Sequence, residues 1–142
     1  MQTWVYGVSI ERDGEDFVVS VRDLPEVVTS GYSLEEALEL AADAVEVIVE
    51  GRMDDHEDLP RPSPVKRGEH TVALPAHLAA KASVYSAWKA SKLSKSELAR
   101  RLGRNETEVR RILDPHHGTK LDQMEEAAKA LGTRLVIAYE PV

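Results

Sequence analysis

Five arginines stand within one short segment of the second half of the chain, LARRLGRNETEVRRIL (residues 98–113). Guanidinium groups neutralise phosphates and can pair in bidentate fashion with guanine, so arginines at this density indicate contact with nucleic acid. The alternative is a plain helical hairpin whose charged side chains are only solvated. The elements around the arginines decide between the two.

The segment has the pattern of two short helices joined by a turn. Ser94 and Glu97 form a capping box for a helix over 95–102, and Asn105 can cap a second helix over 106–113. Gly103 permits the tight turn between them. The pattern predicts a helix-turn-helix, in which the first helix braces the second and the second lies along base edges.

The outward positions of the second helix supply the candidate base contacts. Arg110 is the strongest, because arginine bonds both major-groove acceptors of guanine. Thr107 could contact a base or a thymine methyl, and Glu106 could accept a hydrogen bond from cytosine. Phosphate contacts position a protein without specifying sequence. We expect them from Lys95, Ser96, Arg104, Arg111, Thr119 and Lys120.

Helices over 76–90 and 121–132 flank this segment, and RLVIAYE (134–140) has the alternation of a short strand. A lone strand leaves its backbone groups unpaired. We therefore expect it to pair either within the chain or with a second copy. The second option predicts a homodimer, or a higher oligomer, through this half of the chain.

The first half has strand signals followed by one long helix. The helix, 33–51, opens with a capping box at Ser33 and Glu36 and has Gly51 as its expected stop. A proline-rich loop at 53–68 follows. The expected strands are 3–11, 17–21, 26–31 and 69–74. The fold class is thus α+β, with a β-β-β-α(-β) domain over 1–74 and a helical domain over 75–142.

Charge is divided unequally between these two domains. Residues 1–74 hold 6 Lys and Arg against 17 Asp and Glu, a balance of −11, whereas residues 75–142 hold 12 against 8, a balance of +4. Such a division indicates phosphates as partner of the second domain and a basic protein as partner of the first. The acidic candidates share one face of the predicted helix: Glu39, Asp43, Glu46 and Glu50.

Other chemistry has weaker support. Four carboxylates, Glu11, Asp13, Asp16 and Asp23, suggest a two-metal nuclease, but three of them lie in or beside a hairpin loop, where Asp serves turn geometry. The adjacent His116 and His117 point apart and lack a third metal ligand. The chain has no cysteine, no secretory signal and no apolar run of about 18 residues. We expect a cytoplasmic, non-enzymatic protein without cofactor, metal or membrane contact, located at the nucleoid when bound to DNA.

Motifs in both halves resemble a single family. Residues 13–45 contain a strand hairpin, a D-L-P turn at 23–25, a T-x-G at 29–31 and a helix that opens S-x-E-E-A. This order resembles the HicB antitoxin family of type II toxin–antitoxin systems, although Arg22 stands where those proteins often have proline. Residues 93–132 are similar to a Cro/repressor-type helix-turn-helix domain, with Arg110 at a position usually held by a small residue.

The resemblance implies a degenerate ribonuclease H-like first domain that binds and neutralises a HicA-like, mRNA-cleaving toxin. It also implies a second domain that represses the operon by binding operator DNA. The residues alone leave an alternative open, a stand-alone helix-turn-helix regulator whose first domain senses a ligand or oligomerises.

Overall fold

The computed structural model describes residues 1–142 and divides into two compact units, Met1–Ala79 and Ala80–Val142. The division falls within helix α2 (Ala76–Ser91), a few residues after the boundary expected near Leu74. No helix has the length and apolar character that crossing a membrane requires.

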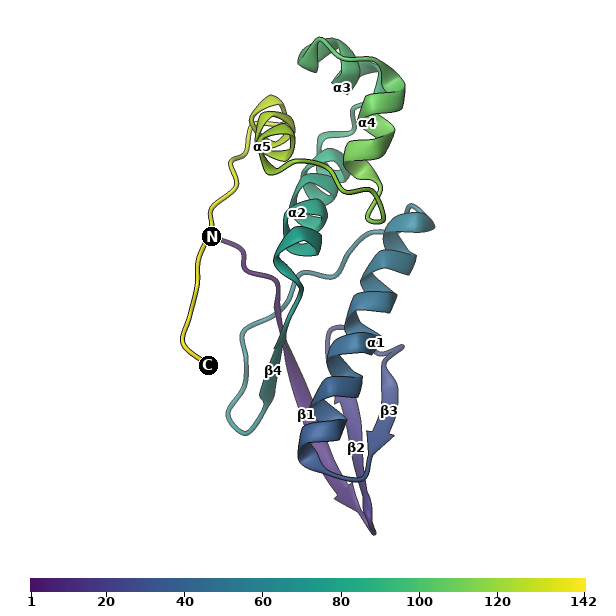
Figure 1. Cartoon of the computed structure of the whole chain (residues 1–142), viewed down its shortest axis with the longest axis vertical. Coiled ribbons are helices and arrows are strands. Elements are labelled where there is room, and N and C mark those ends of the chain that lie inside the picture. The colour runs from purple at the N-terminus through teal and green to yellow at the C-terminus, as the bar shows by residue number, and fades with distance from the viewer. The chain divides into compact units, whose positions relative to one another are not determined.

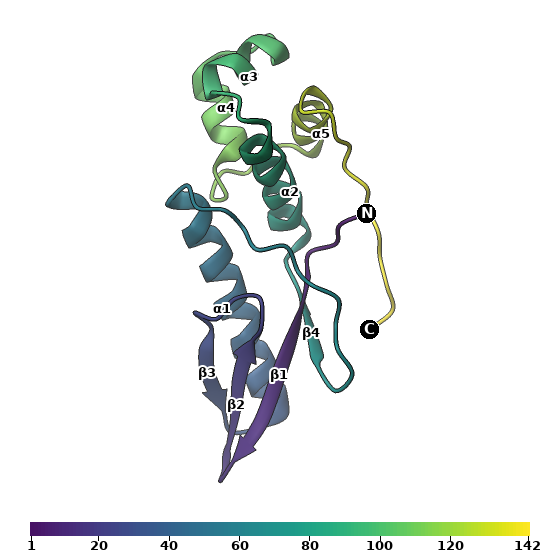
Figure 2. The ribbon, with the colours of Figure 1, turned by 180° about the vertical axis from the view of Figure 1, so that it is seen from behind.

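The first unit is an antiparallel sheet with one helix across it. Helix α1 (Leu34–Asp54) covers one face of the sheet in both views (Figures 1 and 2). The four expected strands are confirmed, and their order in the sheet is β3-β2-β1-β4. Their bounds are β1 (Val5–Asp13), β2 (Asp16–Val21), β3 (Val28–Gly31) and β4 (His70–Ala73).

The register between strands determines which side chains meet α1. Because Val8 pairs with Val21, the alternation of side chains along β1 and β2 places Val8, Val19 and Val21 on one face of the sheet, where they are buried. Helix α1 meets this core with one buried residue every four positions: Ala37, Ala41, Val45, Val49 and Met53. Gly31 is required where the helix begins, since a Cβ there would lie 2.7 Å from the backbone nitrogen of Ala37.

Helix α1 continues past Gly51, so the expected stop at that glycine is wrong. An interior glycine costs a helix about 1 kcal/mol. Two tertiary interactions beyond it outweigh that cost: Met53 is buried, and Arg52 forms a salt bridge with Glu26 at 2.8 Å. The helix ends at Asp54, and His56, at a positive φ of 56°, turns the chain away.

The second unit contains only helices. After α2 come α3 (Lys95–Leu102), α4 (Glu106–Leu113) and α5 (Leu121–Ala130), as the sequence predicts. Each of these three helices contributes apolar residues to one core. Its buried members are Val84, Leu98, Ala99, Val109, Ile112, Leu113, Met124, Ala127 and Ala128.

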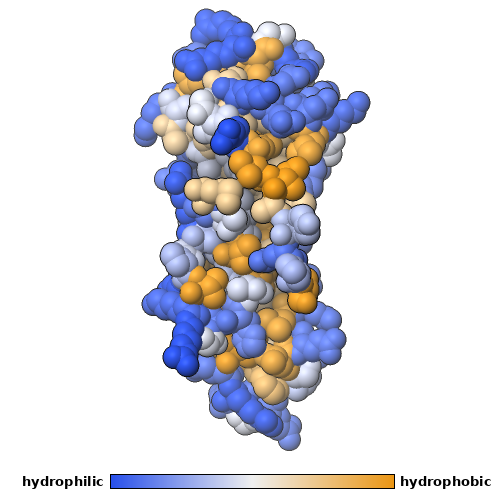
Figure 3. Space-filling model, turned by 90° about the vertical axis from the view of Figure 1, so that its left-hand side faces the viewer, coloured by the Kyte–Doolittle hydropathy of each residue, from blue (hydrophilic) through white to orange (hydrophobic).

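No strand forms over 134–140, so the expected terminal strand is wrong for a single chain. A strand needs a neighbour for its backbone groups, and the second unit offers none. Leu135 is half-buried against the core of the second unit. The larger apolar side chains after it are exposed: 54% for Val136, 77% for Ile137 and 98% for Tyr139. Figure 3 is viewed from the left-hand side of Figure 1, where this segment is drawn. It shows hydrophobic residues among hydrophilic ones on that surface.

Candidate nucleic-acid interface and acidic face

The junction of α3 and α4 has the caps that the sequence predicts. Ser94 Oγ accepts from the backbone amide of Glu97 at 3.1 Å, and Asn105 Oδ1 accepts from that of Glu108 at 2.8 Å. Gly103 ends α3 in the left-handed region, at φ 64°. The turn between the two helices thus consists of Gly103, Arg104 and Asn105, which end α3 and start α4.

Packing decides which side of α4 faces outward. Val109, Ile112 and Leu113 are buried in the core of the unit. Thr107, Arg110 and Arg111 are exposed, and 62% of the Arg110 side chain is accessible. The expected base-reading residue therefore lies on an open helical surface.

Glu106 orients Arg110. Its carboxylate lies 2.8 Å from Nη2 of Arg110 and accepts a second hydrogen bond from Ser96 Oγ at 3.0 Å. The bond from Ser96 and the charge of Arg110 lower the pKa of Glu106. Glu106 is thus a paired anion that joins the start of α3 to Arg110, which limits its repulsion of phosphate.

Arg104 binds carboxylates of its own unit. One nitrogen lies 3.1 Å from Glu126 of α5 and the other 3.5 Å from Glu108 of α4. The hydrogen bond with Glu126 is the main cause that raises the pKa of Arg104. This guanidinium joins the α3–α4 turn to α5, so a role in holding the helices together fits it better than the expected phosphate contact.

Lys95 and Lys120 remain accessible to a phosphate backbone in different ways. Lys95, at the start of α3, holds its ammonium 5.7 Å from the ring centroid of Trp88. This cation–π contact directs the charge without neutralising it. Lys120 is exposed at the N-cap position of α5 and makes no side-chain cap.

Thr119 is placed differently from the sequence expectation of a phosphate contact. It is only 4% exposed, and its hydroxyl oxygen lies 2.6 Å from Nζ of Lys81 and 3.2 Å from the carbonyl oxygen of Arg111. The hydroxyl therefore serves the interior of the unit.

Lys81 is the important residue that sequence reasoning missed. It is fully buried on α2, and its ammonium also donates to the carbonyls of Arg111 and Ile112, at 2.8 and 3.0 Å. Burial lowers the pKa of Lys81 to about 8, and the charge of Asp114 partly opposes that shift. Lysine is rarely buried unless it is paired, and its partners here are distant in sequence, so no local signal marks it.

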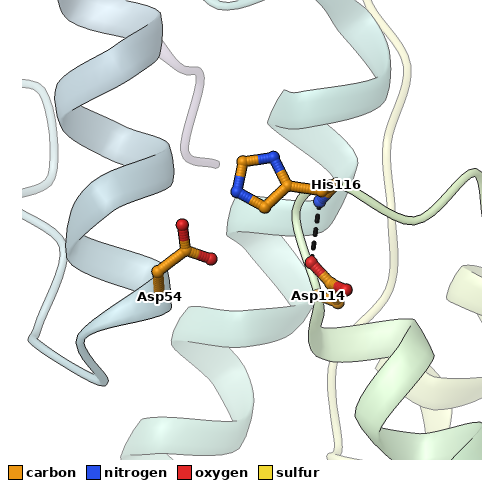
Figure 4. Close-up of side chains that lie close together, drawn as sticks. All are labelled: Asp54, Asp114 and His116. Atoms are coloured by element: carbon orange, nitrogen blue, oxygen red, sulfur yellow. Dashed lines mark hydrogen bonds between the residues drawn. The ribbon is translucent and has the colours of Figure 1, made fainter.

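The loop after α4 folds on itself next to Lys81. The backbone amide of His116 donates to Oδ1 of Asp114 at 2.9 Å (Figure 4). Asp54, which is drawn in the same figure, is a residue of the first unit and takes no part in this hydrogen bond. The amide of Thr119 donates to the carbonyl of His117 at 2.9 Å. Both histidines are exposed.

The four acidic candidates lie on α1 at spacings that place them on one face of the helix. Glu39 and Asp43 are exposed, whereas Glu46 and Glu50 are half-buried. Val47 lies beside them and is 65% exposed, although it is apolar. This surface of α1, which we call the acidic face, therefore combines negative charge with an accessible apolar side chain.

The structure does not gather the carboxylates considered for a nuclease. Asp23 accepts hydrogen bonds from Ser63, whereas Glu11, Asp13 and Asp16 are exposed on the β1–β2 hairpin.

Comparison with known proteins gives consistent results over most of the chain. A family model described as the HicB-like antitoxin of bacterial toxin–antitoxin systems matches residues 5–83. Antitoxin HicB 1 of Photorhabdus laumondii is 40% identical over 136 residues, 95% of this chain and 86% of that protein. Antitoxin HicB of Escherichia coli K12 is 38% identical over 119 residues, 84% and 86% of the two chains. Antitoxin HicB of Pseudomonas fluorescens is 32% identical over 136 residues, 95% and 93%. The chain belongs to the HicB-like family of antitoxins.

Proposed function

We propose that this antitoxin neutralises a HicA-like, mRNA-cleaving toxin through its first unit and represses the operon encoding both through its second. The observation that carries the proposal is the placement of charge on two separate units. An acidic helical face lies on one, and an open helical surface with Arg110 and Arg111 lies on the other.

The DNA-binding half of the proposal rests on α3 and α4 acting as a Cro/repressor-type helix-turn-helix. A major groove admits one α-helix, and α4 presents Thr107 and Arg110 without obstruction from its own unit. Arg110 would read a guanine, with Glu106 directing its guanidinium. Phosphate contacts would come from Lys95, Ser96, Arg111 and Lys120.

The toxin-binding half rests on electrostatics. An enzyme that cleaves mRNA needs a basic surface, because neutralising phosphates supplies much of its affinity for RNA. The acidic face of α1 offers that surface a competing partner, and Val47 offers an apolar anchor. The first unit would thus be a ribonuclease H-like fold that serves as a binding scaffold.

Co-expression with the product of the neighbouring gene tests both halves. We expect a tagged antitoxin to recover a small basic protein and to stop its cleavage of mRNA at equimolar ratio. The same complex should retard a duplex from upstream of the operon more than a random duplex. Retardation without any recovered toxin would instead identify a stand-alone regulator whose first unit senses a ligand or oligomerises.

A further inference from the structure

We propose that Lys81 is a positioning residue for DNA binding. From the interior of the second unit it holds the end of α4 and the loop 114–120 in one relative position. The inference rests on the proposed DNA-binding function and specifies how its contact surface is held. Lys81 and Thr119 are buried, so their role in DNA binding would be indirect.

One ammonium group meets three acceptors from two segments. Nζ of Lys81 donates to the carbonyls of Arg111 and Ile112 and to Oγ1 of Thr119, at 2.8, 3.0 and 2.6 Å. The hydroxyl of Thr119 in turn donates a hydrogen bond to the carbonyl of Arg111 at 3.2 Å. These bonds use all three protons of the ammonium group.

His117 extends this network to the surface. Its Nδ1 lies 3.0 Å from Oγ1 of Thr119. The exposed imidazole of His117 is therefore connected through Thr119 to the buried ammonium of Lys81.

A lysine in this place needs an explanation, because burying an ammonium is costly and a methionine would fill similar space without that cost. The carbonyls of Arg111 and Ile112 belong to the last turn of α4, where intrahelical donors run out. The only backbone bond there is the one from the amide of Asp114 to the carbonyl of Arg111, at 3.2 Å. A positive charge near the C-terminal end of a helix also interacts favourably with the negative end of the helix dipole. Lys81 thus stabilises an eight-residue helix that would be marginal alone.

The consequence for binding lies in the groups around the network. Arg111 precedes it on α4, and His116, His117 and Lys120 are exposed on the loop next to Thr119. Phosphates along a duplex have fixed spacing, so these groups can engage them together only if α4 and the loop keep one relative position. Loss of that position should cost several weak contacts at once and leave the fold intact.

The test compares Thr119→Val, which removes the hydroxyl but keeps the shape, with Thr119→Ser, which keeps the hydroxyl. Affinity of the full chain for operator and random duplexes is measured by fluorescence anisotropy across salt concentrations, together with Tm. We expect Thr119→Val to weaken both duplexes by about fivefold and to flatten the log–log salt slope by about one unit, the value of one phosphate contact. Thr119→Ser should resemble wild type.

Toxin binding serves as the internal control, because it involves the first unit and should be equal in all three proteins. If Thr119→Val lowers Tm but leaves DNA affinity and salt slope unchanged, Lys81 and Thr119 are structural only and the inference is wrong. A wild-type chain that binds no duplex overturns both the proposed function and this inference. Wild-type binding with an unaffected Thr119→Val overturns the inference alone.

A second measurement covers the case in which Thr119→Val fails to fold. Raising the pH of the wild-type protein from 7 to 9 removes one proton from Lys81, and a neutral amine has two donors for three acceptors. The groups that face it are Asp114, the two carbonyls, Thr119 and, through Thr119, His117. DNA affinity should fall about threefold over this range, and a flat profile would refute the positioning role.

Discussion

Asp23 accepts two hydrogen bonds from Ser63, which follows it forty residues later in the chain. The backbone amide of Ser63 lies 2.9 Å from Oδ2 and its hydroxyl 2.8 Å from Oδ1. Arg22 donates to the same hydroxyl at 2.8 Å and to Glu69 at 2.6 Å. The D-L-P turn and the proline-rich loop, two separate motifs in the sequence, therefore form one contact that holds the loop to the sheet.

Loss of this contact should release the loop without unfolding the unit. Ser63→Ala removes the hydroxyl and leaves the carboxylate of Asp23 with one donor, so we expect the free energy of unfolding to fall by about 1–2 kcal/mol. Hydrogen exchange should accelerate in residues 57–68 and remain unchanged in α4. Ser20→Ala, at an exposed position of β2, is the control. Unaltered exchange in the loop would mean that other contacts, such as Tyr6 with the carbonyl of Pro60, are sufficient.

Arg110 and Lys120 should differ in what they contribute to DNA binding. Arg110→Ala should weaken operator binding more than binding to random DNA, by about 1–3 kcal/mol, because base contacts carry discrimination. Lys120→Ala should weaken both equally and flatten the salt slope, since it meets phosphate. Binding titrations on the two duplexes measure this. Equal effects from the two substitutions would remove the base-reading role of Arg110.

The acidic face should govern how fast the toxin is captured. The double reversal Asp43→Lys, Glu46→Lys should slow association strongly and remove most of its salt dependence, since steering depends on complementary charge. Stopped-flow mixing with toxin measures the rate. The control is Glu11→Lys, Glu15→Lys, which makes the same change in net charge on the β1–β2 hairpin of the same unit. An unchanged rate in the first variant would place the toxin elsewhere, for example at a sheet edge.

Local signals in the sequence were sufficient for much of the second unit. Ser94 with Glu97, Gly103 and Asn105 define α3, its turn and the start of α4, because caps and turns depend on residues three or four apart. The same holds for Ser33, whose hydroxyl caps α1.

Every feature that the sequence did not reveal depends on partners that are distant in the chain. Gly51 lies inside α1 because Arg52 meets Glu26, and Thr119 is buried because Lys81 reaches it from α2. The pattern of 134–140 is that of a strand, yet a strand forms only when a second one lies beside it. In each case the deciding interaction joins residues far apart in the chain, where periodicity and spacing carry no information.

Stability should rise with pH because of Lys81. Its pKa is about 8 in the folded chain against 10.5 for an ordinary lysine, so between these values the unfolded state binds more protons than the folded one. By linkage, the free energy of unfolding then increases as pH rises through this window. Urea titrations at pH 7.5 and 9.5 measure the change, and Lys81→Met should abolish it. An equal rise in Lys81→Met would assign the effect to another group.

Deletion of residues 134–142 should yield monomers that bind the operator weakly. The segment has strand-like alternation, no strand beside it in its own chain and exposed Val136, Ile137 and Tyr139. Pairing with a second copy would satisfy its backbone and cover these side chains. A helix-turn-helix dimer reads two half-sites one turn apart, and the dimer contact sets that spacing. Light scattering after size-exclusion chromatography gives the mass, and titration on whole and half operators gives the affinity. We expect the truncated chain to bind both operators equally and weakly, whereas the full chain prefers the whole operator. A truncated chain that remains dimeric would show that another surface joins the two copies.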